Sequence, residues 1–224
     1  MKTPVFVIHY PPLTERKTNI MKQLDKRGIN AEWVEHWNKG DEFVNRVKQY
    51  TNTKLPDGHL SCYLKRLYVY DKMVNEDISH AIILEDDVII DDEFDNLTIK
   101  PGTNYMRLGL GLAVRNPHYW NSSEKIKMSG CDVYKILNPG GGEATWVTSF
   151  FAYSALRKIC FNYSHDIGEF ALLKFNMKGI PVCTQFGFKS SMDETDENII
   201  DWKNELLQYS TYPKYDWNNI RKLI

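Results

Sequence analysis

The sequence predicts an α/β fold in which a doubly wound, mainly parallel sheet is flanked by helices. Apolar strand-like runs alternate with helix-patterned segments over residues 4–90, which is the pattern of parallel strands joined by crossover helices. The run 80–84, "HAIIL", shows no polar alternation, as expected for a central strand buried on both faces. The 224 residues, 42% of them hydrophobic, suit one core. We therefore expect a single domain over residues 1–224, with a core at 4–191 and a C-terminal tail at 192–224.

The first half of the chain has clear local signals. Pro11 and Pro12 end the first strand because proline has no backbone N–H to donate. Thr14 fits the N-cap of the first helix, and Gly28 fits the position just beyond its end. In the longest helix the apolar residues recur at i, i+3, i+4 and i+7. The expected elements are strands at 4–10, 30–37 and 80–84 and helices at 14–28, 41–50 and 57–75.

The second half is less regular. A glycine-rich loop, "NPGGG", leads into another apolar run, and the chain becomes acidic and then polar beyond residue 190. The expected elements are strands at 104–112, 131–137 and 181–186 and helices at 155–163 and 167–179.

Composition disfavours several classes of protein. The formal net charge is −1 and no basic block is present, so we expect no nucleic-acid partner. The apolar runs are far shorter than the ~20 residues that cross a bilayer, and no secretory signal is visible. We therefore expect no transmembrane segment and a cytoplasmic location. The four cysteines form no C-x-x-C pair, which disfavours a zinc site.

Three consecutive acids, Glu85, Asp86 and Asp87, follow the buried strand at 80–84. Each pair of carboxylates held within ~4 Å costs on the order of 1 kcal/mol even in water. In doubly wound sheets ligands bind beyond the carboxyl ends of the strands, and hard divalent cations prefer oxygen ligands. The triplet therefore predicts a manganese or magnesium site held by Asp87 with Asp86 or Glu85. In the alternative, Glu85 and Asp86 cap a turn and are solvated.

Other polar motifs carry weaker signals. The segment "PGGGE" lacks the layout of a P-loop, so it fits either an active-site flap or a plain turn. No G-x-S-x-G elbow is present to support a hydrolase triad. Asp166 precedes a predicted helix, where an ordinary N-cap is an alternative to a functional role.

Several segments, in order along residues 4–191, resemble glycosyltransferase family 25, which includes lipopolysaccharide glycosyltransferases and collagen galactosyltransferases. No single motif is specific, but together they carry the resemblance. They are "VFVIHYPPLTERKTNIMKQL" with Arg16, "GHLSCYLKRL" with Cys62 and Leu67, "LEDD" at 84–87, "TSFFAYSALRKI" at 148–159, Asp166 in "SHDIGEFALLKF", and Gln185 through Ser190.

The resemblance implies a GT-A-like fold and transfer of a sugar from a nucleotide-sugar, most often a UDP-sugar, to a hydroxyl of a glycan or protein. It also implies a manganese ion, with magnesium as the substitute, at the acidic motif. By position, Asp166 is the candidate catalytic base. The remaining candidates are His9, Tyr10, Arg16, Glu85 and Asp86 at the nucleotide and Asp87 with Glu85 at the metal. For Arg16, a charge on the helix surface is the alternative.

The chain departs from the family pattern at two places. His9 stands where the family has Asn, and Lys65-Arg66 stand where it has a Ser-His pair. Contacts of these positions with donor or acceptor would change the sugar or the acceptor, or abolish activity. A catalytically silent nucleotide- or carbohydrate-binding homologue therefore stays open. A metal-dependent phosphotransferase stays open too, because a strand followed by acids also suits phosphoryl chemistry.

Overall fold

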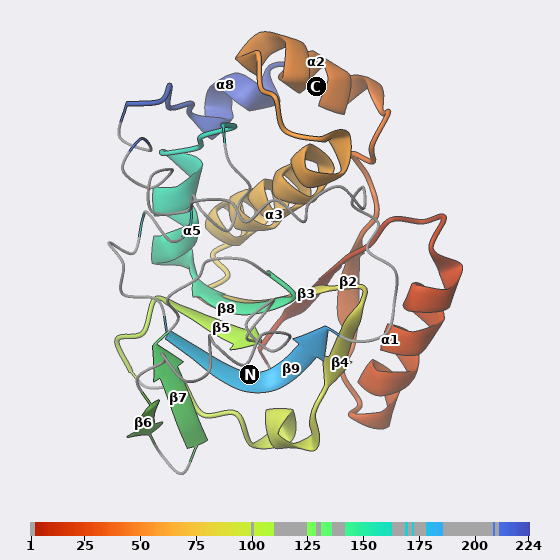
Figure 1. Ribbon diagram of the computed structural model, residues 1–224, viewed down its shortest axis with the longest axis vertical. Helices are drawn as coiled ribbons and strands as arrows, with labels where there is room; N and C mark the ends of the chain where they lie inside the picture. Colours follow the sequence, from red (N-terminus) through yellow and green to blue (C-terminus); the bar gives the residue numbers. More distant parts are fainter. Residues whose placement is uncertain are drawn as a thin grey trace.

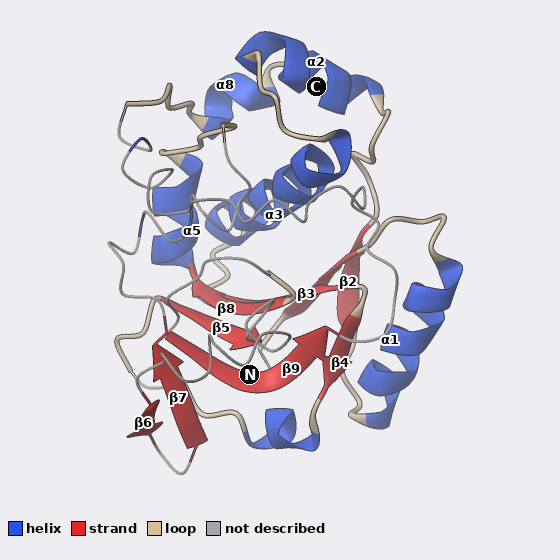
Figure 2. Ribbon diagram, in the orientation of Figure 1, coloured by secondary structure: helices blue, strands red, loops and turns tan. Residues whose placement is uncertain are grey.

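A computed structural model describes residues 3–99, 101–109, 125–128, 131–135, 142–162, 178–185 and 211–224, with the single residues 169, 172 and 208. Figure 1 shows helices packed around a central sheet, and Figure 2 separates the two kinds of element by colour. The strands are β1 (Val5–Ile8), β2 (Ala31–Val34), β3 (His80–Glu85), β4 (Val88–Ile90), β5 (Tyr105–Gly109), β6 (Lys125–Met128), β7 (Cys131–Lys135), β8 (Ala144–Thr148) and β9 (Lys178–Gln185). The helices are α1 (Thr14–Lys26), α2 (Glu42–Thr51), α3 (Asp57–Asn75), the 3-10 helix η1 (Asp92–Asn96), α5 (Ser149–Leu156) and α8 (Trp217–Arg221).

The sheet has the strand order β2-β1-β3-β8-β5-β9-β7-β6, and β4 pairs with β9. β1 is parallel to both β2 and β3, because α1 and the α2–α3 pair supply the crossovers that parallel neighbours need. Beyond β3 the pairing is antiparallel except for β5 with β9. The α/β class is therefore confirmed, whereas the expected parallel arrangement holds for the first three strands and gives way to a mixed sheet. Between β6 and β7 only two residues intervene, which suffices for a hairpin and not for a crossover.

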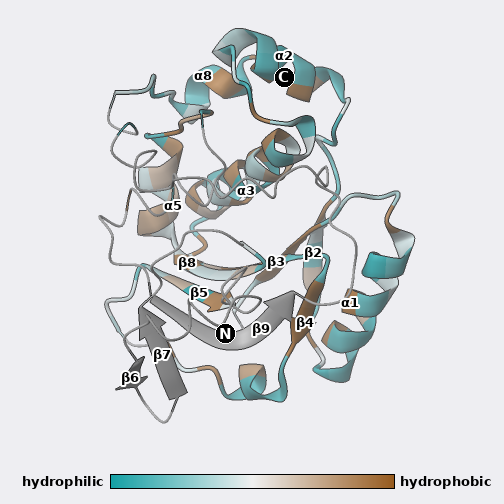
Figure 3. Cartoon of the chain, in the orientation of Figure 1, coloured by the Kyte–Doolittle hydropathy of each residue, from teal (hydrophilic) through white to brown (hydrophobic). Residues whose placement is uncertain are grey.

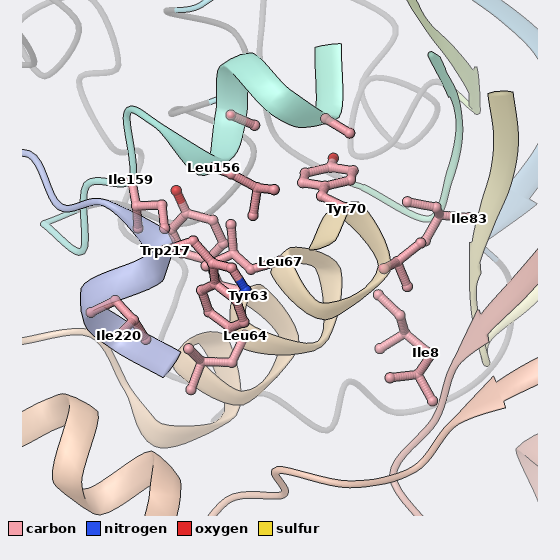
Figure 4. Packing of buried hydrophobic residues seen from close by; sticks show 14 of the residues in the cluster. Ile8, Tyr63, Leu64, Leu67, Tyr70, Ile83, Leu156, Ile159, Trp217 and Ile220 are labelled. Atoms are coloured by element: carbon pink, nitrogen blue, oxygen red, sulfur yellow. The ribbon is translucent and has the colours of Figure 1, made fainter. Parts of the chain in front are cut away.

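Helices cover both faces of the first three strands, as a doubly wound sheet requires. On one face, Phe6 and Ile8 of β1 join an apolar cluster built from α2, α3, α5 and α8. Figure 4 shows Ile8 and Ile83 directed toward α3, with residues of α8 on the far side of that helix. On the other face, Val5 and Val7 pack in a second cluster that includes residues of α1. In Figure 3 most of α1 is coloured hydrophilic, whereas β3, β4 and α5 are apolar.

The ends of α1 agree only in part with the sequence signals. Gly28 has a φ of +60°, a left-handed conformation in which glycine carries no steric penalty, so its predicted place beyond the helix is confirmed. The predicted N-cap at Thr14 is wrong by one residue. Leu13 occupies the cap without a side-chain hydrogen bond, and Thr14 is already helical.

The helix predicted at 155–163 is wrong in position. Thr148 caps α5 through its Oγ1, which accepts from Phe151 N at 3.3 Å, so the helix begins at Ser149 and ends at Leu156. Beyond it, Ile159 pairs with Tyr215 through two backbone hydrogen bonds. The N-cap at Thr148 therefore sets the beginning of the helix at Ser149, whereas the apolar pattern of residues 155–163 predicted a later start.

The last two described elements, β9 and α8, belong to the sheet and to the apolar core. β9 begins at Lys178, three residues before the predicted strand and in place of the last residues of the helix expected at 167–179; the rest of that helix lies largely outside the described residues. Trp217 and Ile220 of α8 are buried in the same cluster as α3. Among the described residues, no helix combines the length and apolar character needed to cross a bilayer.

Candidate active site

Polar side chains from β1, α1 and the turn after β3 meet at the carboxyl ends of the parallel strands. His9 and Tyr10 follow β1, and Asp86 and Asp87 follow β3, its neighbour in the sheet. His9 Nδ1 lies 2.7 Å from Asp86 Oδ2, and Tyr10 N donates to the same oxygen at 3.3 Å. Arg16 completes the group from the first turn of α1. We call His9, Arg16, Asp86 and Asp87 the crevice network.

Arg16 links the two aspartates. Its Nη1 donates to Asp86 Oδ1 at 3.1 Å and to Asp87 Oδ2 at 3.0 Å. One guanidinium therefore offsets much of the repulsion between adjacent carboxylates that the sequence implied. The Arg16 side chain is 6% exposed, so the alternative of a surface charge on the helix is wrong.

Asp86 is held as a buried carboxylate. Burial alone would raise its pKa, but hydrogen bonds from His9 and Arg16, the charge of Arg16 and the Tyr10 amide act in the opposite direction and keep the pKa below its ordinary value. Asp86 and Asp87 are 6% and 4% exposed. The alternative in which the acids are solvated is therefore wrong for these two residues.

The donor chemistry of the triplet fits a hard divalent cation. Both oxygens of Asp86 accept hydrogen bonds from protein groups, and Asp87 Oδ2 accepts one from Arg16. Asp87 and Glu85 stay the predicted metal ligands, because both offer carboxylate oxygens at the end of β3. Glu85 is half-buried at the end of β3, with the Cys62 thiol 3.7 Å from its Oε1. Magnesium-like ions are commonly bound by one or two carboxylates together with substrate phosphates. Within the described part of the chain, no three His, Cys, Asp or Glu side chains gather as a metal-binding group.

Lys65 joins the crevice network to the loop after β2. Its Nζ donates to the His9 carbonyl oxygen at 2.5 Å and to Asn38 Oδ1 at 2.8 Å, from the middle of α3. Burial lowers the pKa of this amine, although the nearby Cys62 and Asp86 act in the opposite direction. The lysine thereby fixes the backbone at the end of β1.

Arg66, the next residue of α3, enters a second network on the side of β5 and β8. Its Nε lies 3.2 Å from Glu169 Oε1, and its Nη2 donates to Thr145 Oγ1 at 2.8 Å. Tyr70 and Tyr105 donate to the two oxygens of Glu169. Burial and the Glu169 charge raise the pKa of both phenols well above the ordinary value, so they stay protonated donors. We call Arg66, Tyr70, Tyr105 and Glu169 the buried network.

The structure brings most of the predicted site residues together. The group comprises His9, Tyr10, Arg16, Glu85, Asp86 and Asp87. Their roles toward a nucleotide or metal stay predictions. Asp166 lies outside the described residues, and its role as base stays a prediction too. Sequence reasoning did not single out Glu35 and Asn38. The predicted second strand, 30–37, included Glu35, whereas β2 ends at Val34 and leaves this acid directly after the strand.

The departures from the family pattern occupy connected positions. His9 binds Asp86, Lys65 binds the carbonyl of His9, and Arg66 follows Lys65 on α3. These side chains are 0–2% exposed. The three changes are therefore interior polar contacts of this chain, and His9 and Lys65 reach the strand ends where a ligand is expected.

Two comparisons by sequence found similar proteins. A family model described as "Glycosyltransferase family 25 (LPS biosynthesis protein)" matches residues 2–129, more than half of the chain. The chain is also 23% identical, over 184 residues, to "Lipooligosaccharide biosynthesis protein lic2B" of Haemophilus influenzae, and the match covers 77% of this chain and 69% of that protein.

Among the solved structures that match, one is similar at a low level. It is described as "crystal structure of a glycosyltransferase involved in the glycosylation of the major capsid of PBCV-1", with 11% identity and a TM-score of 0.33. The similarity covers 68% of this chain and 62% of that one, so the chain spans less than two thirds of its length.

Proposed function

The chain belongs to glycosyltransferase family 25, and from that premise we propose that it transfers a sugar from a nucleotide-sugar donor to a hydroxyl group of a glycan or protein. The donor is a UDP-sugar, and the reaction depends on manganese or magnesium. The observation that carries the proposal is that the matched residues 2–129 contain the whole crevice network. The resemblance seen in the sequence is confirmed at the level of the family.

The crevice network suits the leaving-group side of this reaction. Asp87 and Glu85 would hold the metal, which when bound supplies positive charge to the diphosphate as the bond to the sugar breaks. Arg16 offers a second fixed positive charge at the same strand ends. His9 holds the carboxylate of Asp86 in place, and this carboxylate in turn holds the guanidinium of Arg16 in one position.

The acceptor side requires a base. A carboxylate within ~3 Å of the acceptor hydroxyl would remove its proton during transfer. Asp166 holds this role in the proposal by its place in the family pattern. Glu143 and Asp193 are the alternatives. The backbone carbonyl of Glu143 accepts from Glu85 N at 2.8 Å, and Asp193 lies outside the described residues.

Calorimetry with UDP, in the presence and absence of Mn²⁺, tests the donor side. The wild type should bind UDP more tightly with the metal, and Asp87→Asn should lose most of that gain while keeping its melting temperature within a few degrees. Asp92→Asn is the matched control, since its side chain is 81% exposed on η1, away from the crevice network. Metal-independent binding in the wild type, or unchanged binding in Asp87→Asn, would refute the metal assignment.

Turnover with a panel of nucleotide sugars separates transfer from the alternatives. Release of UDP that increases with an added glycan or peptide acceptor supports transfer. Binding without turnover would identify a silent homologue, and transfer of phosphate in place of sugar would identify a phosphotransferase.

The base is tested by Asp166→Asn. Asparagine retains an oxygen acceptor, so an ordinary N-cap should tolerate the change. A base should lose on the order of 10²-fold or more in turnover while UDP and metal affinity are retained. Full activity would remove Asp166 from the mechanism, and Glu143→Gln would then be the next variant.

A further inference from the structure

The loop that follows β2, residues 35–41, lies at the same sheet edge as the crevice network. β2 is parallel to β1 with Val34 opposite Ile8, and His9 N donates to Val34 O at 3.1 Å. Glu35 therefore leaves the sheet beside His9. Its Oε1 lies 4.0 Å from His9 Nε2, a fully buried atom with no hydrogen-bond partner in the described part of the chain.

The loop is built with a strained and well-supported backbone. Trp37 has a φ of +59°, which a bulky L-residue rarely adopts and which costs free energy that its surroundings must offset. Ser61 Oγ donates to the Trp37 carbonyl at 2.7 Å, and the indole packs against Phe43 with centroids 4.7 Å apart. Backbone strain of this kind clusters at ligand-binding sites.

Contacts on both sides hold the loop against the end of β1. Lys65 donates to Asn38 Oδ1 as well as to His9 O, so one buried amine joins the two loops. Lys39 Nζ lies 5.3 Å from the centre of the Tyr10 ring, a cation–π contact across the same gap. The residues that follow β1 and β2 therefore form one structural unit.

Glu35 carries an exposed carboxylate in this unit. Its side chain is 37% exposed, and Lys17 Nζ lies 2.6 Å from Oε1. In dinucleotide-binding α/β folds an acidic residue at the end of the second strand accepts hydrogen bonds from the hydroxyls of the ribose. The parallel β1–β2 pair places Glu35 at the corresponding position here.

We propose that Glu35 binds the ribose of the donor nucleotide, with the loop 35–41 as the wall of the nucleoside site. This inference rests on the proposed function, because it names the part of the nucleotide-sugar that the β2 edge recognises. A carboxylate accepts charge-assisted hydrogen bonds from the vicinal hydroxyls, and such bonds contribute more to affinity than neutral ones.

The test is calorimetric binding of UDP and 2′-deoxy-UDP, with Mn²⁺ present, to the wild type and two variants. Glu35→Ala removes the proposed acceptor. Glu32→Ala is the matched control, because Glu32 lies on the same strand, is 44% exposed and pairs at 3.5 Å with Lys72 of α3. The wild type and Glu32→Ala should prefer UDP by about tenfold, the size expected for one charge-assisted hydrogen bond, whereas Glu35→Ala should bind the two nucleotides within about twofold of each other.

Two results would overturn the inference alone: a wild type that binds UDP without preferring it over the deoxy form, or a Glu35→Ala variant that keeps the preference. A wild type that binds no uridine nucleotide would overturn the proposed donor as well. The preference is a ratio within one variant, so a general loss of stability does not imitate its disappearance.

Discussion

The crevice network and the buried network are equally enclosed but differ in charge. The four members of each are at most 6% exposed. In the buried network one guanidinium, that of Arg66, meets one carboxylate, that of Glu169, and two neutral phenols donate to the same acid. The charges balance, and each oxygen of Glu169 accepts hydrogen bonds.

The crevice network has a different balance. Two carboxylates, Asp86 and Asp87, share one guanidinium, that of Arg16. The formal sum of these three groups is one negative charge. Burial by itself therefore does not distinguish a structural ion pair from a candidate functional site in this molecule. The distinguishing features are the excess of negative charge and its position at the ends of parallel strands.

The largest effect is expected from Arg66→Met, which leaves Glu169 buried without its cation. Removing one partner of an enclosed ion pair destabilises a protein by about 3–5 kcal/mol. Urea denaturation should show this loss, and the double variant Arg66→Met with Glu169→Leu should recover part of it. Arg46→Ala, which breaks an exposed helix-surface pair with Glu42, is the control and should change stability by less than about 0.5 kcal/mol. A change as small as this in Arg66→Met would contradict the prediction, because it would show that Glu169 does not depend on the Arg66 charge inside the protein.

Arg16→Met should cost less, about 2–3 kcal/mol, because under the proposed function a divalent cation bound by Asp87 and Glu85 partly replaces the guanidinium. Addition of Mn²⁺ should raise the melting temperature of Arg16→Met more than that of the wild type. The melting temperature of Arg66→Met should not respond to the metal in this way, and a response equal to that of Arg16→Met would remove the distinction between the two networks.

The sequence predicted the fold of the first 90 residues well because local signals determine it. Apart from β4 (Val88–Ile90), which was not predicted, the strands and helices there lie within a few residues of their predicted bounds, since hydrophobic periodicity, prolines and Gly28 act over short distances. The place of the acidic triplet followed from β3 in the same way. The domain limits and the roles of the site residues stay predictions.

The partners of the charged residues could not be predicted, because they come from distant parts of the chain. Arg16 is 70 residues from Asp86, and Arg66 is 103 residues from Glu169. The available signal was a pair of adjacent cations, Lys65 and Arg66, between the apolar residues Leu64 and Leu67 of α3. Two such residues in the interior require polar partners, but the sequence does not identify them.

A smaller effect on stability than that of Arg16→Met is expected from Asp86→Asn, and it should depend on pH in the acid range. Its pKa is lower in the folded state than in the unfolded chain, so its contribution is complete above the unfolded value of about 4 and is lost as the pH falls through the folded value. The stability difference between the wild type and Asp86→Asn should therefore shrink from about pH 5 to about pH 3, at up to about 1.4 kcal/mol per unit. A difference that stays constant in urea denaturation over this range would contradict the carboxylate assignment.

The smallest effect on stability is expected from Tyr105→Phe, and its pH dependence should appear at alkaline pH. Loss of one donor to Glu169 should cost about 1 kcal/mol at neutral pH, because Tyr70 and Arg66 still bind that carboxylate. The Tyr105 pKa is raised in the folded state, so its contribution is complete below the unfolded value of about 10 and falls as the pH rises beyond it. The stability difference between the wild type and the variant should accordingly narrow above about pH 10, where the unfolded wild-type chain ionises first.

Tyr70→Phe, which removes the donor to the other oxygen of Glu169, should behave in the same way. The difference between the wild type and Asp86→Asn should not narrow in base, because the Asp86 carboxylate of the wild type titrates in acid. The pH range in which each network loses its contribution would therefore separate the two.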